Sequence, residues 1–290
     1  MKEDFESKQS HSELSAVITK SNRKLFISLI CAAGAFSIIT VFGVMNGEGS
    51  LYSNVLAVAT SGSALVVSLQ VINRQKTKGL FPRLYASLGV ALALWFAAEV
   101  IWAYYETVAG IETPFPSLAD AFWLAGYVPF FYFLYGINKH FLGMSKSMTL
   151  PVLGLSSIGF VLLGNVLLSI NQAADLTSQD GILSYIIGSA YPVADMFLLV
   201  PAIAAFVQLR KGKLTSTPWA FIVIAVIVFI IADIGFAYST SISEFEDTVW
   251  VWNPLYNIGD FAIASSLFWH KAFFTIDEKK LIKDWQEKNR

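Results

Sequence analysis

Long apolar stretches alternate with short polar segments along the whole chain. A helix needs about 20 predominantly apolar residues to cross the hydrocarbon core of a bilayer. Stretches of this length occur at 25–45, 52–73, 84–106, 119–138, 151–170, 182–209, 218–240 and 254–274. They predict an all-α integral membrane protein in which residues 25–274 form a bundle of eight transmembrane helices. Residues 1–24 and 275–290 are then polar tails, and the first stretch is interpreted as a signal anchor.

The composition agrees with this class and excludes several kinds of site. Hydrophobic residues make up 55% of the 290 residues and charged residues 14%, whereas a soluble domain carries about 25% charged residues. The single cysteine, Cys31, excludes an intrachain disulfide and any cysteine-rich metal site. No Walker, GxGxxG, HExxH or nucleophile-elbow motif occurs, so no enzyme class is indicated. Nothing in the sequence supports nucleic-acid binding.

The positions of the basic residues orient the predicted helices. All 20 lysines and arginines fall before the first stretch, after the second, fourth and sixth stretches, or at the end of the eighth stretch and beyond it. An even number of crossings separates these positions, so all of them lie on one side of the membrane. Cytoplasmic segments carry an excess of Lys and Arg. We therefore expect a multi-pass cell-membrane protein with both termini in the cytoplasm.

The segments on the opposite side are acidic. They contain Glu48, Glu106, Glu112, Asp175, Asp180, Glu244, Glu246 and Asp247, with no basic residue. One interpretation is that the positive-inside rule simply depletes bases there. The other is a surface that gathers cations by long-range attraction.

Two segments of the chain resemble each other and align without a gap. Residues 98–104 are Ala-Glu-Val-Ile-Trp-Ala-Tyr, and residues 232–238 are Ala-Asp-Ile-Gly-Phe-Ala-Tyr. Each segment has an acid, an aromatic residue three positions later, and then Ala-Tyr. We interpret the chain as four repeated two-helix hairpins, each going out and returning, around an axis along the membrane normal.

A proline followed by an acid marks the start of three returning stretches. The pairs are Pro116 with Asp120, Pro192 with Asp195, and Pro254 with Asp260. Proline suits the first turn of a helix, where its missing N–H is not needed. A carboxylate in that turn caps free backbone N–H groups and meets the positive end of the helix dipole. Helix capping is one interpretation of these three aspartates, and ligand binding is the other.

Glu99 and Asp233 need a different explanation, because no helix begins near them. Each lies about seven residues before the outer end of its stretch, about 10 Å into the membrane at 1.5 Å per residue. An ionisable group at that depth normally faces the bundle interior or a wet cavity, and it is a functional hypothesis by default. The alternative is a pair of protonated carboxyl groups that hydrogen-bond to neighbouring helices.

If the hairpins pack in a ring, five acids converge in its outer half: Glu99, Asp120, Asp195, Asp233 and Asp260. Aromatic residues crowd the same level, namely Trp102, Tyr104, Tyr105, Trp123, Tyr127, Tyr191, Tyr238, Trp250, Trp252 and Tyr256. They form either the usual interfacial belt or, with the acids, an outward-facing binding pocket. From the repeated segments, Trp102, Tyr104 and Tyr238 are the aromatic candidates for that pocket. Its ligand would be an organic cation or, through oxygen ligands only, a hard metal ion; the sequence identifies neither the metal nor a cofactor.

Residues 115–127, Phe-Pro-Ser-Leu-Ala-Asp-Ala-Phe-Trp-Leu-Ala-Gly-Tyr, carry a resemblance to a known group of proteins. The Pro-Ser-x-Ala-Asp-x-x-x-Leu-x-x-Tyr pattern, after a span with Glu and Trp, resembles amino-terminal membrane regions of bacterial diguanylate cyclases, phosphodiesterases and membrane histidine kinases. The resemblance covers mainly the third and fourth stretches and implies a sensory role. No cyclase, phosphodiesterase or kinase domain follows the eighth stretch here. The resemblance therefore implies a module that signals through a cytoplasmic or membrane partner.

Two main functional hypotheses follow. One is a polytopic membrane sensor or ligand-binding module with an outward-facing pocket of carboxylates and aromatics. The other is a cation- or proton-coupled transporter or channel, because repeats with intramembrane acids are typical of transporters. Transport requires a polar path to the cytoplasm. The inner parts of the third, sixth and seventh stretches are almost entirely apolar, so we rank transport second.

Overall fold

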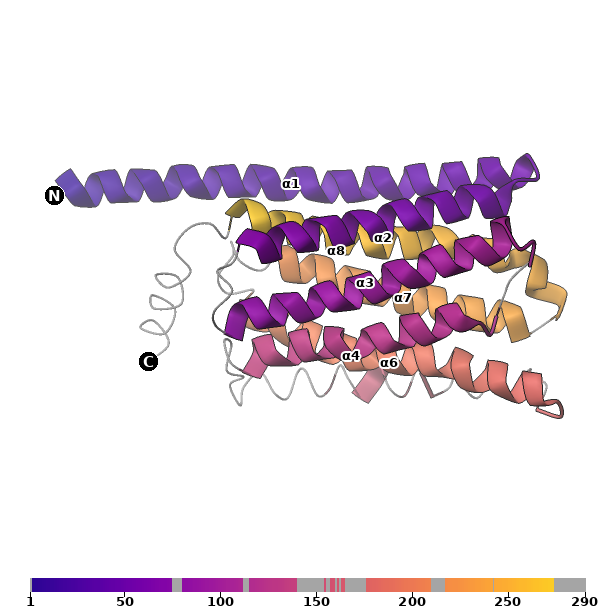
Figure 1. Cartoon of the computed structure of the whole chain (residues 1–290). Coiled ribbons are helices and arrows are strands. Elements are labelled where there is room, and N and C mark those ends of the chain that lie inside the picture. The colour runs from indigo at the N-terminus through magenta and orange to yellow at the C-terminus, as the bar shows by residue number, and fades with distance from the viewer. Residues whose placement is uncertain are drawn as a thin grey trace.

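The computed structural model describes residues 2–74, 80–111, 115–139, 176–209, 217–241 and 243–273, and a few residues between 154 and 164. The described residues are helical apart from short turns and contain no strand. The helices are α1 (Lys2–Met45), α2 (Gly49–Arg74), α3 (Leu80–Thr107), α4 (Leu118–Ile137), α6 (Gln179–Leu209), α7 (Thr217–Ser241), the 3-10 helix η3 (Ser243–Trp252) and α8 (Asn253–Phe273). They run side by side along one axis (Figure 1).

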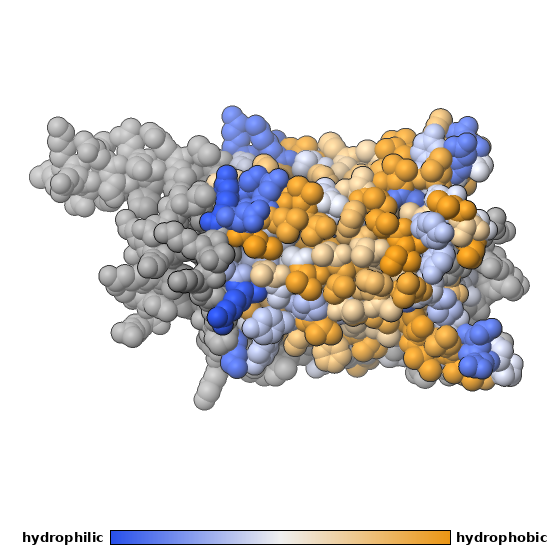
Figure 2. Space-filling model, viewed as in Figure 1, coloured by the Kyte–Doolittle hydropathy of each residue, from blue (hydrophilic) through white to orange (hydrophobic). Residues whose placement is uncertain are grey.

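Six of the described helices are long and apolar enough to cross a membrane, which confirms an α-helical membrane protein. The apolar segments are Thr19–Met45, Gly49–Arg74, Pro82–Thr107, Leu118–Ile137, Gln179–Gln208 and Thr217–Thr240. Figure 2 shows the corresponding apolar band between two more hydrophilic ends. The predicted fifth span, 151–170, and the tail 275–290 lie largely or wholly outside the described residues.

Helix α8 occupies the place of the predicted eighth span but is more polar than the six apolar helical segments named above. It has 21 residues, which is enough to span the hydrocarbon core. Its buried polar side chains are Asn257, Asp260, Ser265, Ser266 and His270. Polar side chains in a membrane helix normally face the protein interior, and those of α8 do so here.

Six helices form a closed ring, and α1 stands outside it. Going around the ring, each helix packs against the next in the order α2, α3, α4, α6, α7, α8, and α8 returns to α2. α1 packs at the periphery of the ring, mainly against α2 and α8, with Phe26 stacked on Phe221 of α7. It extends past the other helices at its amino-terminal end (Figure 1). The segment 1–24, expected as a tail, is thus part of the same helix as the first span from Lys2 onward.

Small side chains allow the ring helices to approach closely. Between apolar lipid tails the hydrophobic effect does not drive helices together, so close backbone packing matters more than in water. Alanines from all six ring helices are completely buried at the helix contacts: Ala64, Ala91, Ala98, Ala119, Ala202, Ala205, Ala225, Ala232 and Ala262.

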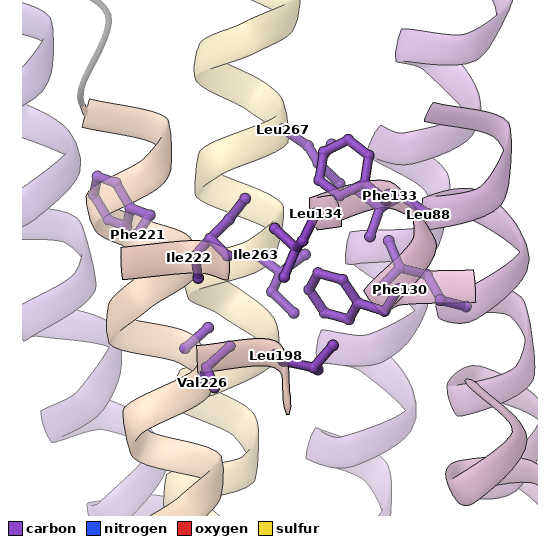
Figure 3. Close-up of a cluster of buried hydrophobic side chains, with 14 of the residues drawn as sticks. Leu88, Phe130, Phe133, Leu134, Leu198, Phe221, Ile222, Val226, Ile263 and Leu267 are labelled. Carbon is purple, nitrogen blue, oxygen red and sulfur yellow. The ribbon is translucent and has the colours of Figure 1, made fainter. Parts of the chain in front are cut away.

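Large apolar side chains fill one half of the ring. Figure 3 shows this cluster between the helices. Its labelled members, which come from α3, α4, α6, α7 and α8, are Leu88, Phe130, Phe133, Leu134, Leu198, Phe221, Ile222, Val226, Ile263 and Leu267. They lie near the beginnings of α3 and α7 and in the later parts of α4, α6 and α8. We call this cluster the apolar plug.

Candidate functional site

A cavity of about 120 Å³ lies inside the ring, where α3 and α7 end and α4 and α8 begin. All six ring helices contribute to its wall. Four carboxylates and nine aromatic side chains line it, and none of the lining residues is basic. The acids are Glu99, Asp120, Asp233 and Asp260, and the aromatics are Trp95, Trp102, Phe115, Trp123, Tyr127, Tyr191, Phe229, Phe236 and Tyr256. The structure thus brings four of the five acids singled out in the sequence to one cavity.

Glu99 and Asp233 enter this cavity from matching positions on α3 and α7. Each lies eight residues before the end of its helix, which is about 12 Å at 1.5 Å per residue. Each accepts a hydrogen bond from an aromatic side chain on the next α-helix of the chain. Trp123 Nε1 donates to Glu99 Oε1 at 3.1 Å, and the Tyr256 hydroxyl donates to Asp233 Oδ1 at 2.7 Å.

Asp120 both caps α4 and faces the cavity. Ser117 is the N-cap residue, and the Ser117 backbone N–H donates to Asp120 Oδ2 at 2.6 Å in a capping box. The other carboxylate oxygen of Asp120 accepts a hydrogen bond of 2.7 Å from the Tyr191 hydroxyl on α6. The capping interpretation is therefore confirmed for Asp120, and it leaves this carboxylate facing the cavity.

The capping interpretation is wrong for Asp195 and Asp260. α6 begins at Gln179 and continues through Pro192, so Asp195 lies in the middle of the helix. α8 begins at Asn253, and Asp260 lies about two turns further on. Proline within a membrane helix is tolerated because neighbouring groups satisfy the freed backbone carbonyl. The proline at 192 therefore did not mark a helix start.

Tyr127 connects two of the acids. Its hydroxyl donates to Asp195 Oδ1 at 2.8 Å and lies 3.4 Å from Asp233 Oδ2. Asp195 is completely buried, and its Oδ2 has no hydrogen-bond partner among the described residues. Asp195 therefore lies behind the wall formed by Tyr127 instead of lining the cavity itself.

Asp260 belongs to a polar contact between α8 and α2. The Thr60 hydroxyl lies 3.0 Å from Asn257 Oδ1 and 3.5 Å from Asp260 Oδ2. Asn257 is buried, and its Nδ2 has no partner within the described part of the chain. Sequence reasoning missed Thr60 and Asn257, because a lone threonine or asparagine in an apolar stretch does not reveal which helix it faces.

Of the three aromatic candidates in the repeated segments, only Trp102 lines the cavity. Tyr104 and Tyr238 are 56% and 40% exposed and are not part of the wall. The period of the α-helix, 3.6 residues per turn, explains this correction. Trp102 comes three positions after Glu99 and so shares its face of α3, whereas Tyr104 comes five positions after Glu99 and points away from that face. The same spacing separates Tyr238 from Asp233.

Two aromatic rings that sequence reasoning missed lie on the apolar-plug side of the acids. Trp95 and Phe229 line the cavity and contact each other edge to face, with ring centroids 5.4 Å apart. Each packs against a glycine on the following helix. A Cβ atom at Gly126 would lie 2.4 Å from the Trp95 ring, and one at Gly259 would lie 2.3 Å from the Phe229 ring. The signal was present in the sequence, since each ring comes four positions before the acid of its own repeated segment.

The polar groups of the cavity wall are carboxylates, the hydroxyls of tyrosines and Ser53, the amides of Asn54 and Asn253, and indole N–H groups, all beside aromatic rings. Among the described residues, no group of three or more His, Cys, Asp or Glu side chains is arranged to hold a metal ion. The acids lie on different helices and are each tied to an aromatic hydroxyl, an indole N–H or a threonine hydroxyl. Carboxylates beside aromatic faces are groups that can interact with the charge and the surface of an organic cation.

Comparison of the chain with models of protein families, with curated proteins and with solved structures gave no match.

Proposed function

We propose that the chain is a polytopic membrane sensor or ligand-binding module that holds a small organic cation and signals through a partner. The observation that carries the proposal is a cavity with four carboxylates and no basic lining residue. Uncompensated negative charge away from bulk water attracts a cation strongly. The aromatic faces add a cation–π attraction that selects an ammonium group.

The cavity opens toward the outside in this proposal, and both termini are cytoplasmic. Described basic residues lie at the end of the bundle away from the cavity: Lys20, Arg23, Lys24, Arg74, Arg83, Lys139 and Lys271. The positive-inside rule assigns that end to the cytoplasm. With α8 and the stretch 151–170 counted as spans, the chain crosses the membrane eight times.

The spans form two repeated halves in this proposal, with α2–α4 equivalent to α6–α8. In the ring, α7 lies three places from α3, and α8 lies three places from α4, as a twofold axis along the membrane normal requires. The hydrogen bond from Trp123 to Glu99 has its counterpart in the hydrogen bond from Tyr256 to Asp233. Compared with four equivalent hairpins, two halves account for these paired contacts directly.

Transport of a cation is the second candidate, because repeated halves with intramembrane acids are typical of transporters. The apolar plug argues against it. Its members in Figure 3 fill the half of the ring between the cavity and the proposed cytoplasmic end, and phenylalanine and leucine side chains offer no hydration to a moving ion. A ligand that enters the cavity has no described polar route onward.

Tyr127 offers a route by which ligand binding changes the helix arrangement. A cation at Asp233 competes with the Tyr127 hydroxyl for the same carboxylate. The Tyr127 hydroxyl then remains hydrogen-bonded to Asp195 in the middle of α6. Pro192 and Pro201 weaken the backbone hydrogen bonding of this helix. A shift of α6 at its cytoplasmic end is the change that a partner would read.

Methylammonium binding to the full chain in detergent tests the proposal, with Trp102→Ala and Tyr104→Ala as matched variants. A cation–π contact of about 1 kcal/mol corresponds to about a fivefold change in affinity, so Trp102→Ala should weaken binding by that factor. Tyr104→Ala should leave the affinity unchanged. Equal effects of the two variants, or no saturable binding by calorimetry, would contradict the site.

Uptake into proteoliposomes separates the two candidate functions. With radiolabelled methylammonium, a sensor binds without accumulation, so internal label should equal that of protein-free vesicles. Accumulation that depends on Glu99 would favour the transporter. Glu48→Gln is the control, since Glu48 is an exposed acid in the turn between α1 and α2 and outside the cavity.

A further inference from the structure

Glu99 and Asp233 are matched in sequence position, helix position and hydrogen bonding. They hold the same place in the two repeated segments, lie equally far from their helix ends, and each receives a close donor from the following helix, Trp123 or Tyr256. Both line the same cavity. A ligand in this cavity therefore meets two equivalent carboxyl groups on opposite members of the ring.

The rings of Trp95 and Phe229 form an apolar surface beside these two acids. They touch each other and are held by Gly126 and Gly259, which have no side chain to push the rings away. This surface suits a short hydrocarbon chain. The cavity thus combines two matched carboxyl groups with an apolar contact surface.

The hydrogen bonds already made by side chains of the cavity wall indicate which groups a ligand must supply. The hydroxyls of Tyr191 and Tyr256 and the indole N–H of Trp123 are already donated to carboxylates. The two hydroxyls and the carboxylates retain capacity only as acceptors. Asp195 lies behind Tyr127, and its Oδ2 atom accepts no hydrogen bond from the described residues. No basic residue lines the cavity to balance its four acids, and a ligand that carries positive charge and N–H groups would do so.

We propose that the cavity binds a short α,ω-diammonium compound, with one ammonium at Glu99, the other at Asp233, and the alkyl chain across Trp95 and Phe229. This inference rests on the proposed cation-binding function and names its ligand class. A diammonium supplies two charges and six N–H donors, whereas a quaternary ammonium ion supplies one charge and no N–H. A cavity of about 150 Å³ holds benzene, with its six carbon atoms, so the cavity of about 120 Å³ here favours a short diamine of about six non-hydrogen atoms, such as 1,4-diaminobutane.

Calorimetry on the full chain in detergent with 1,4-diaminobutane, butylamine, tetramethylammonium and 1,4-butanediol tests the inference. The diamine should bind at least tenfold more tightly than butylamine, because it uses both acids. Tetramethylammonium should bind more weakly than butylamine, and the neutral diol should show no binding. 1,6-Diaminohexane should bind more weakly than 1,4-diaminobutane because of its length.

Variants show whether the second charge is recognised. In Glu99→Gln and in Asp233→Asn, the affinity ratio of diamine to butylamine should fall to about 1, while Glu48→Gln should retain the wild-type ratio. A wild-type ratio near 1 with saturable butylamine binding would overturn the diammonium assignment and leave cation binding intact. If no amine binds, both this inference and the proposed function fail. The wild-type ligand series alone decides the matter if a variant does not fold.

Discussion

Removing the hydroxyl of Tyr127 should destabilise the protein more than removing any single ordinary hydrogen bond. Tyr127→Phe keeps the ring, which packs edge to face on Trp95 at 5.5 Å, and deletes the hydroxyl that donates to Asp195, whose other oxygen has no partner among the described residues. Asp233 keeps its hydrogen bond from Tyr256. The substitution therefore destabilises the protein by leaving the buried Asp195 carboxylate without its hydrogen-bond donor.

Two known free energies set the range for the loss of stability in Tyr127→Phe. A side-chain hydrogen bond between membrane helices contributes on average about 0.6 kcal/mol and at most about 1.7 kcal/mol. Leaving a buried acceptor without a partner costs about 1–3 kcal/mol. Asp195 is completely buried and already has one unpartnered oxygen within the described part of the chain, so the second figure applies. We expect Tyr127→Phe to lower the free energy of unfolding by about 2 kcal/mol.

Reversible unfolding in mixed micelles of SDS and a mild detergent measures this difference. Tyr135→Phe is the matched control, because Tyr135 also lies on α4 but is about half exposed. The double variant Tyr127→Phe with Asp195→Leu should recover most of the loss, since removing both partners of a buried hydrogen bond is nearly neutral. A Tyr127→Phe loss no larger than that of Tyr135→Phe, or no recovery in the double variant, would refute this account of the Tyr127 network.

Two further predictions concern the cavity wall and the topology. Gly126→Ala should displace the Trp95 ring, lower stability by about 1–3 kcal/mol as overpacking does, and weaken amine binding. Gly34→Ala in α1, where a Cβ meets nothing within 4 Å, should lower neither stability nor affinity. Equal unfolding curves for the two glycine variants would contradict this packing. In a Cys31→Ser background, a cysteine replacing Ala109 should react with an impermeant thiol reagent added to intact cells, and one replacing Lys20 should not. The reverse labelling pattern would invert the proposed orientation.

The helical class and the location of the site could be predicted from the sequence because both follow from local rules. Apolar length gives the spans, and an ionisable residue deep inside a span must face the interior. Glu99 and Asp233 were identified in this way and lie in the cavity. The helical period alone would also have separated Trp102 from Tyr104.

The partners of each acid could not be predicted, because they depend on the order of helices around the ring. Tyr127 on α4 meets Asp195 on α6 and Asp233 on α7, and no spacing along the chain encodes that meeting. The start of α6 was also unpredictable from Pro192, since a packed membrane helix compensates for a proline that would end a helix in water. Tertiary contacts therefore decide which acids cap, which line the cavity and which lie behind it.

The position of α1 has a practical consequence. It packs mainly against α2 and α8, touches α7 through the stacked rings of Phe26 and Phe221, and supplies no residue to the cavity wall. Side chains such as Ile30, Ile38 and Met45 are exposed at its surface. A fluorescent protein or an affinity tag joined ahead of this helix is therefore attached to a helix that does not line the cavity. Such a fusion would allow occupancy of the cavity to be followed in living cells without altering the groups that create it.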